Sequence, residues 1–277
     1  MTFSAERIQI QGLDVVRSGQ RGAPLLLLLR MAANTELWGG VWPGLAAEFD
    51  VAQVRLRTPS HSELDAPAEM FRRLSAQCAA VASELGHEQF HVFGWNGGTH
   101  VALRCAIDFP GRVRSCVLLG PFWPLEDMRR IDAGLEIMRV MMEQPDRVLY
   151  ATYWFMGGLS PKFVSERFDD VLRWAHARAA GDPFLQGASV GAMKWAKVLR
   201  GQWTVAQELD ALAVRTLIIA HGLDPWNAGP TVEMAAALHR KLPASRLEVL
   251  EGCGSLVPLE DPERLLGVLL PFLKEYR

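Results

Sequence analysis

The sequence predicts an α/β fold, a mainly parallel sheet of eight strands covered by helices on both faces. Two observations predict it. Short runs rich in β-branched and aromatic residues alternate with longer amphipathic runs of helical period, which is the pattern of a parallel sheet. The alternation stops at about residue 122 and resumes at about residue 208, so the residues between them are predicted to form an inserted helical unit.

Eight runs have the length and composition of strands: residues 7–10, 15–17, 25–29, 51–56, 90–95, 115–119, 216–220 and 247–250. The run 25–29 is leucine throughout, and a strand without polar alternation fits the centre of a sheet, buried on both sides. Amphipathic stretches predict helices at residues 66–85, 98–109, 230–242 and 262–274. This repeated alternation of a strand with a helix predicts a single hydrophobic core.

The segment 122–207 reads as helices only and is rich in aromatic residues and methionines. We predict a helical cap at 122–207 over a core formed by residues 1–121 and 208–277. Apolar side chains at helical spacing usually pack against one another, so most are expected to form the cap's own core. The remaining ones are expected to line a pocket.

Composition excludes several classes of function. The chain has 29 Lys and Arg against 31 Asp and Glu, so it lacks the basic field that attracts nucleic acid. Its four cysteines are scattered and show no metal or redox spacing, which predicts reduced core thiols, no metal and no cofactor. The start lacks a leader pattern and no run reaches the roughly 20 apolar residues of a membrane helix. We expect a cytoplasmic protein.

A strand-to-helix turn is predicted at residues 94–98. The β-rich run 90–93 ends in Gly-Trp-Asn-Gly-Gly, and a helical pattern begins at once. Such a sharp turn holds one side chain up at the end of the sheet, between small neighbours, because nothing bulkier fits. The side chain held there is that of Asn96.

This turn resembles the G-x-S-x-G nucleophile elbow of the α/β-hydrolase superfamily, in its capped branch of enol-lactone hydrolases and esterases, with Asn96 in the serine's place. Asp224, in Ala-His-Gly-Leu-Asp-Pro at 220–225, is similar to the family's triad acid. Ser255 stands where the family has its histidine, in the loop 248–262. The resemblance covers nearly the whole chain and implies an α/β-hydrolase fold with the order elbow, acid, histidine position.

Two more loops depart from the family pattern. Leu-Arg-Met at 29–31 occupies the place of the His-Gly-x oxyanion loop, so Arg30 replaces a glycine and Met31 would supply the backbone N–H. The segment 55–62 resembles the Asp-x-Arg-Gly-x-Gly-x-Ser turn without its glycines. Changes in four functional loops indicate a changed chemistry.

The substitutions at 96 and 255 remove the parts that covalent hydrolysis needs. That reaction requires an ionisable oxygen or sulfur nucleophile beside a base of pKa near 7, and neither an amide nor a serine hydroxyl meets the requirement. Losing one such residue costs on the order of 10^6 in turnover in subtilisin. Ordinary serine hydrolysis is therefore expected to be negligible.

We expect a site of Asn96, Asp224 and Ser255, with substrate-binding and oxyanion groups at Arg30, Met31, Trp95, Gly97, His100 and Trp123. Each has a plainer interpretation. Asn96 tolerates left-handed backbone, Asp224 could cap backbone N–H groups, and Ser255 has no base beside it in sequence. Arg30 could be a strand-end charge, and His100 could be a core histidine. His61 and His221 could replace the missing base, although neither has that role in the family.

The favoured function is a non-hydrolytic enzyme, such as a lyase, cyclase or isomerase of specialised metabolism, acting on a small apolar molecule that can carry a carboxylate. The alternatives are a binding protein or pseudoenzyme that uses the same pocket, and a residual esterase or lactonase with a relocated base. Deamidation at Asn96-Gly97 to an aspartate nucleophile is a minor fourth alternative. The expected partner is a small molecule, neither nucleic acid nor membrane, with a homodimer as an open possibility.

Overall fold

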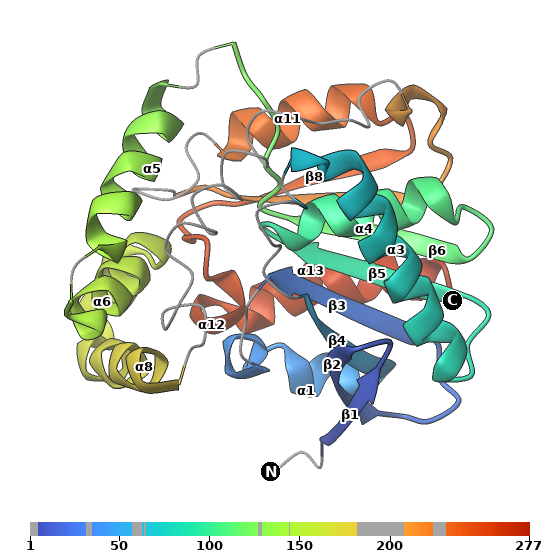
Figure 1. The fold of residues 1–277 in the computed structure, drawn as a ribbon, viewed down its shortest axis with the longest axis horizontal. Helices are drawn as coiled ribbons and strands as arrows, with labels where there is room; N and C mark the ends of the chain where they lie inside the picture. The colour runs from blue at the N-terminus through green and yellow to red at the C-terminus, as the bar shows by residue number, and fades with distance from the viewer. Residues whose placement is uncertain are drawn as a thin grey trace.

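The computed structural model describes residues 5–31, 35–56, 63, 65–126, 129–143, 145–181, 208–223 and 231–277. The chain forms one mixed sheet of eight described strands (Figure 1). In chain order they are β1 (Glu6–Ile10), β2 (Leu13–Gly19), β3 (Leu25–Met31), β4 (Asp50–Leu56), β5 (Phe90–Trp95), β6 (Val113–Leu119), β7 (Thr216–His221) and β8 (Ser245–Leu250). Each predicted strand run is confirmed.

The spatial order of the strands is β1-β2-β4-β3-β5-β6-β7-β8. The pairs β1–β2 and β2–β4 are antiparallel, and the pairs from β4 to β8 are parallel. Chain direction therefore reverses only near β1 and β2, and the carboxyl ends of the parallel strands meet at one edge of the sheet. Ligands of open α/β sheets bind at this edge.

The leucine run of β3 is buried on both faces, as predicted, with every residue from 25 to 29 fully buried. Leu25, Leu27 and Leu29 belong to one hydrophobic cluster, and Leu26 and Leu28 belong to the other. Alternate side chains of a strand point to opposite faces, so a single strand contributes to both halves of the core. This explains why the run carries no polar residue.

Helices cover both faces of the sheet (Figure 1). α3 (Pro67–Glu84), α4 (Gly98–Asp108) and α11 (Thr231–Lys241) pack on one face, and α1 (Trp42–Ala46) and α13 (Pro262–Glu275) pack on the other. The four predicted helices of the core correspond to α3, α4, α11 and α13. Among the described residues the sequence analysis missed four short elements: α1, the 3-10 helices η1 (Thr35–Trp38) and η2 (Leu209–Ala211), and α12 (Val257–Glu260).

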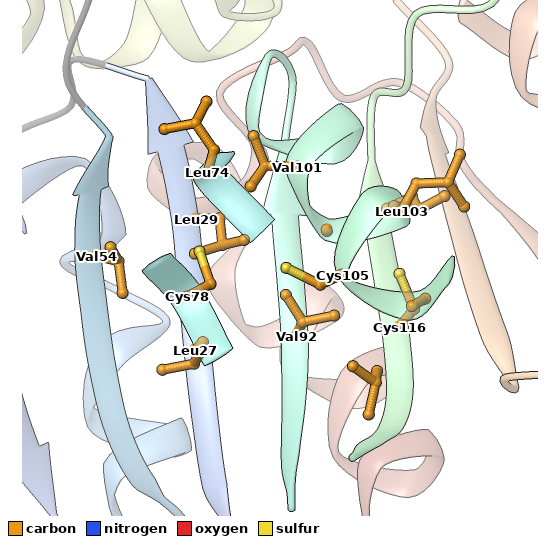
Figure 2. Packing of buried hydrophobic residues seen from close by; sticks show 14 of the residues in the cluster. Leu27, Leu29, Val54, Leu74, Cys78, Val92, Val101, Leu103, Cys105 and Cys116 are labelled. Atoms are coloured by element: carbon orange, nitrogen blue, oxygen red, sulfur yellow. The ribbon is translucent and has the colours of Figure 1, made fainter. Parts of the chain in front are cut away.

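Three of the four cysteines lie in the layer between α3, α4 and the sheet. Figure 2 shows Cys78, Cys105 and Cys116 among leucine and valine side chains. All four cysteines are free and buried, as predicted. Burial raises the pKa of the Cys105 and Cys116 thiols, so both remain protonated and serve as packing groups.

The helical segment between β6 and β7 contains α5 (Arg129–Met142), α6 (Arg147–Gly158), α7 (Pro161–Glu166) and α8 (Phe168–Gly181). Asp146 caps α6 by accepting from the backbone N–H groups of residues 148 and 149, and Ser160 caps α7. In Figure 1 α5, α6 and α8 lie together beside the core. Residues 182–207 lie outside the described part, so the predicted cap boundaries of 122 and 207 stay a prediction.

No helix within the described residues combines the length and apolar character needed to cross a lipid bilayer. A short 3-10 helix, η2 (Leu209–Ala211), leads from the helical segment back to β7.

Candidate active site

The turn between β5 and α4 has the geometry that its sequence predicts. Asn96 has a φ of 48°, which is left-handed backbone, and its N–H donates to O of Leu119 at 2.9 Å. A Cβ on Gly94 would lie 2.4 Å from O of Gly98, and one on Gly98 would lie 2.0 Å from O of Leu29. Both flanking glycines are thus required because backbone approaches too closely for any side chain.

The Asn96 side chain carries a buried amide oxygen. Asn96 as a whole is half-buried, yet its Oδ1 is inaccessible to solvent and has no hydrogen-bond partner within the described part of the chain. Leaving a buried acceptor unsatisfied costs about 1–3 kcal/mol. A Cβ built on Gly120, just after β6, would lie 2.8 Å from this oxygen. The amide oxygen therefore faces the carboxyl end of the neighbouring strand.

His221 at the end of β7 meets Asn96 at the same point. Its Nε2 would lie 3.1 Å from that Cβ on Gly120. The side chain is fully buried, and its Nδ1 donates to O of Leu223 at 3.0 Å. The sequence analysis named His221 only as a candidate replacement base. The signal that could have ranked it higher is its place as the last residue of a buried strand adjacent to the strand that leads into Gly120.

Arg30 is a buried cation at the end of β3, with only 6% of its surface exposed. Its guanidinium lies 3.7 Å from the centroid of the Trp95 ring and 5.5 Å from that of Trp154 in α6. Arg178 of α8 stacks on Trp154 at 3.8 Å. Such stacking is stronger when the cation is desolvated, so Arg30 joins the core to the helical segment.

Ser255 lies under α6, in the loop after β8. It is 4% exposed, and its carbonyl oxygen accepts from the indole N–H of Trp95 at 3.0 Å. Its Oγ would lie 3.1 Å from a Cβ on Gly158, the last residue of α6. The backbone N–H of Leu256 donates to O of Gly158 at 2.8 Å. Ser255 thus joins the elbow, through Trp95, to the helical segment.

The Glu260 carboxylate holds this loop in place. It accepts from the N–H of Gly254 at 2.8 Å and from the N–H of Ser160 at 3.2 Å. One side chain of α12 therefore fixes both the loop after β8 and the connection between α6 and α7. Sequence reasoning missed this residue, because a lone glutamate in a short helix carries no signal.

The other predicted site residues lie in different surroundings. Gly97 is buried in the turn that opens α4, and Met31 ends β3, with its side chain outside the described part. His100 is 6% exposed and stacks on Phe71 of α3 with ring centroids 5.5 Å apart, within the layer between α3 and α4. Trp123 is buried and belongs to the cluster on the same face. Asp224 and His61 lie outside the described residues.

The fold and the elbow define a class: an α/β protein of hydrolase architecture with an asparagine at the elbow. The model of the alpha/beta hydrolase family matches residues 32–268. The chain belongs to the alpha/beta hydrolase family.

Named relatives are hydrolases. The chain is 23% identical over 265 residues to pyrrolizixenacetamide deacetylase of Xenorhabdus hominickii, covering 91% of each. It is 24% identical over 270 residues to pimeloyl-[acyl-carrier protein] methyl ester esterase of Aeromonas hydrophila, covering 94% of this chain and 99% of the relative. Over 146 residues it is 30% identical to fluoroacetate dehalogenase of Burkholderia sp, covering 49% of this chain and 42% of that protein.

Solved structures share the fold. The hydrolase of 2-hydroxy-6-oxo-6-phenylhexa-2,4-dienoate from Rhodococcus sp. strain RHA1 superposes with a TM-score of 0.77 at 18% identity, covering 98% of this chain and 99% of that one. A thermophilic esterase from Thermogutta terrifontis gives a TM-score of 0.73, also at 18% identity, with coverage of 98% and 99%. At this identity the likeness speaks for the fold alone.

Proposed function

We propose that this protein is a non-hydrolytic member of the alpha/beta hydrolase family that acts on a small, largely apolar molecule bearing an anionic group. The observation that carries the proposal is the residue at the elbow. Asn96 presents an amide where the reaction of the family's serine enzymes needs a nucleophile, and an amide can orient or polarise a substrate but cannot form an acyl intermediate.

Arg30 supports the anionic part of this substrate class. A guanidinium that is buried at the carboxyl edge and stacked on Trp95 has the planar geometry and the fixed charge that recognise a carboxylate. The indole rings of Trp95 and Trp154 lie on this guanidinium, so its surroundings are apolar. Together they suit an aryl or alkyl carboxylate.

The test compares hydrolysis with binding. On a panel of 4-nitrophenyl esters from acetate to octanoate, the wild-type protein should give rates at buffer background. The double variant Asn96→Ser/Ser255→His rebuilds two family positions and serves as the positive control. Phenylacetate, followed by calorimetry, should bind the wild type and lose at least about tenfold in affinity in Arg30→Met, since a charge-assisted bond is worth about 1.5–3 kcal/mol. Ester turnover by the wild type, or equal affinity in both proteins, would refute the proposal.

A second candidate is a hydrolase in which water attacks directly and a relocated histidine acts as the base. Two observations favour it: the relatives named above are a deacetylase and an esterase, and His221 lies beside Asn96. In that case the wild type turns over esters, His221→Gln abolishes the rate and Ser255→Ala leaves it unchanged. The same ester panel therefore separates the two functions.

A further inference from the structure

We propose that the outer side of β8 is the docking surface for a second copy of this chain, which pairs antiparallel to it across a two-fold axis at Leu247. β8 is the last strand of the described sheet, and β7 is its neighbour on one side. A strand with one neighbour presents a row of backbone N–H and C=O groups on its other side, and such a row is a template for another strand. The inference is independent of the proposed function.

The backbone of β8 shows which residues face outward. The carbonyl oxygens of Ala244 and Leu250 accept from backbone N–H groups at the start of β7 and just after its end, each at 3.0 Å. Backbone groups of successive residues in a strand point to opposite sides, so the even-numbered residues of β8 point theirs toward β7. Leu247 and Val249 therefore point their N–H and C=O groups away from β7, where a partner strand can bind them.

The charged residues of β8 select one register for this pairing. With the axis at Leu247, Arg246 lies opposite the partner's Glu248 on both sides of the axis. Moving the axis by one residue sets Arg246 opposite the partner's Arg246, or Glu248 opposite the partner's Glu248. Opposite charges that face each other across two strands stabilise the pairing, and like charges destabilise it. The sequence of β8 is therefore complementary to itself in the register centred on Leu247.

Both charged side chains are accessible to a partner, and both lie on the face of β8 that carries α13. The side chain of Glu248 is exposed and has no hydrogen bond or ion pair among the described residues. The side chain of Arg246 is 55% exposed, and its Nη2 donates to Oε1 of Glu275 in α13 at 2.8 Å. A guanidinium has five N–H donors, so Arg246 can keep this bond and still bind the partner's Glu248.

The helices beside β8 extend the contact beyond the two strands. α11 and α13 both pack against β8, on opposite faces of the sheet. A two-fold axis perpendicular to the sheet keeps each helix on its own face, so α13 and the partner's α13 cover the same face of the joined sheet. Stable interfaces bury on the order of 1,000 Å² or more, so the helices contribute to this one together with the strands.

The first experiment measures the oligomeric state of the full-length protein by sedimentation velocity. The wild type should be a dimer. Arg246→Glu places a carboxylate opposite the partner's Glu248 and should raise the dissociation constant about tenfold or more. The charge swap Arg246→Glu/Glu248→Arg restores opposite charges and should restore the dimer. A monomeric wild type, which would leave the strand to a partner of another kind, overturns the proposal, and so does a dimer that Arg246→Glu leaves unchanged or a swap that restores nothing.

Glu275→Gln is the matched control, because Arg246→Glu also removes the ion pair between Arg246 and Glu275 within one chain. The control removes that ion pair and keeps the charges that face each other across the axis. Its dissociation constant should change much less than that of Arg246→Glu. Equal weakening in the two variants would assign the effect to the ion pair within the chain and overturn the proposal.

The second experiment reads the register. With the axis at Leu247, the two copies of this residue form a hydrogen-bonded pair with Cα atoms about 5.5 Å apart, which a disulfide can span. Leu247→Cys should therefore give a covalent dimer under oxidised glutathione, seen by intact-mass measurement; the four native cysteines are buried. Val249→Cys, on the same face, is the control and should give none, because residue 249 faces the partner's Ser245. A covalent dimer from Val249→Cys, or none from Leu247→Cys, overturns the proposed pairing.

Discussion

Buried polar groups at the amino and carboxyl edges of the sheet differ in how far neighbouring residues hydrogen-bond or neutralise them. At the amino edge Asp50 is fully buried and surrounded by Arg17, Arg21 and His87, with Nε of Arg17 at 2.9 Å and Nε2 of His87 at 3.1 Å. Burial alone would raise the pKa of Asp50, but these hydrogen bonds and charges outweigh it and lower the pKa. The charged groups of this cluster are therefore paired with one another and stabilise the fold.

At the carboxyl edge one buried polar group lacks that compensation within the described part of the chain. The amide oxygen of Asn96 has no hydrogen-bond partner among the described residues, and Arg30 lies against an indole face. The backbone at Asn96 is also left-handed. The difference supports the proposal that the amino edge is structural and the carboxyl edge serves a ligand, because proteins retain unsatisfied or strained groups mainly at functional sites. Four predictions test this contrast, from the largest expected effect to the smallest.

Asp50→Asn should lower the free energy of unfolding by about 3 kcal/mol, because it removes one partner of a buried charge cluster. Urea unfolding at neutral pH measures the change. Asp170→Asn on the surface of α8, which pairs with Arg167 and Arg173, is the control and should have little effect. Equal losses in the two variants would show that the amino edge is no more structural than a surface ion pair.

Acid should destabilise the protein through His91, which lies near the amino edge. Burial, followed by the charges of Arg114 and Arg277, lowers the pKa of His91 to about 4. Because this folded-state pKa lies below the unfolded value, the contribution is complete above pH 6.5 and is lost as the pH falls toward 4, by about 3 kcal/mol in total. Urea titrations across that range should slope less in His91→Gln, and parallel slopes would contradict the assignment.

Gly120→Ala should cost about 2 kcal/mol and abolish the activity of the site. The φ of Gly120 is 59°, and a Cβ would press against Asn96 and His221. Gly12→Ala separates the two causes, since Gly12 has a φ of 73° but no atom within 4 Å of a Cβ, so it should lose only about 1 kcal/mol. A loss at Gly120 no greater than that at Gly12 would mean that the point beside Gly120 has room for a methyl group.

Asn96→Gly should raise stability by about 1 kcal/mol while abolishing function. Glycine adopts left-handed backbone without strain, and the substitution removes the unsatisfied amide oxygen. Gln11→Gly, at an exposed turn with a φ of 54°, is the reference for the backbone part, since its side chain makes only an exposed hydrogen bond to Glu84. Thermal unfolding measures both, and a destabilised Asn96→Gly would show that the asparagine is structural.

The sequence predicted the core almost completely and the site only in part. The strands and core helices could be predicted from local patterns such as the leucine run of β3. The elbow could be predicted from Gly94 and Gly98, because neighbouring backbone leaves no room for a side chain at either position. The meeting of Asn96, Gly120 and His221 joins three strands far apart in sequence, so no local pattern encodes it. His100, four residues after Asn96, was a candidate binding residue on its sequence position. It packs on Phe71 instead, because α4 directs its side chain into the layer between α3 and α4.

The most direct test of the central claim is a fluorophosphonate probe followed by intact-mass measurement of the fresh protein. The account predicts no adduct on the wild type, since the elbow carries an amide, and an adduct at residue 96 in Asn96→Ser/Ser255→His. A stoichiometric adduct on a serine of the wild-type protein would contradict it and return the chain to the serine hydrolases.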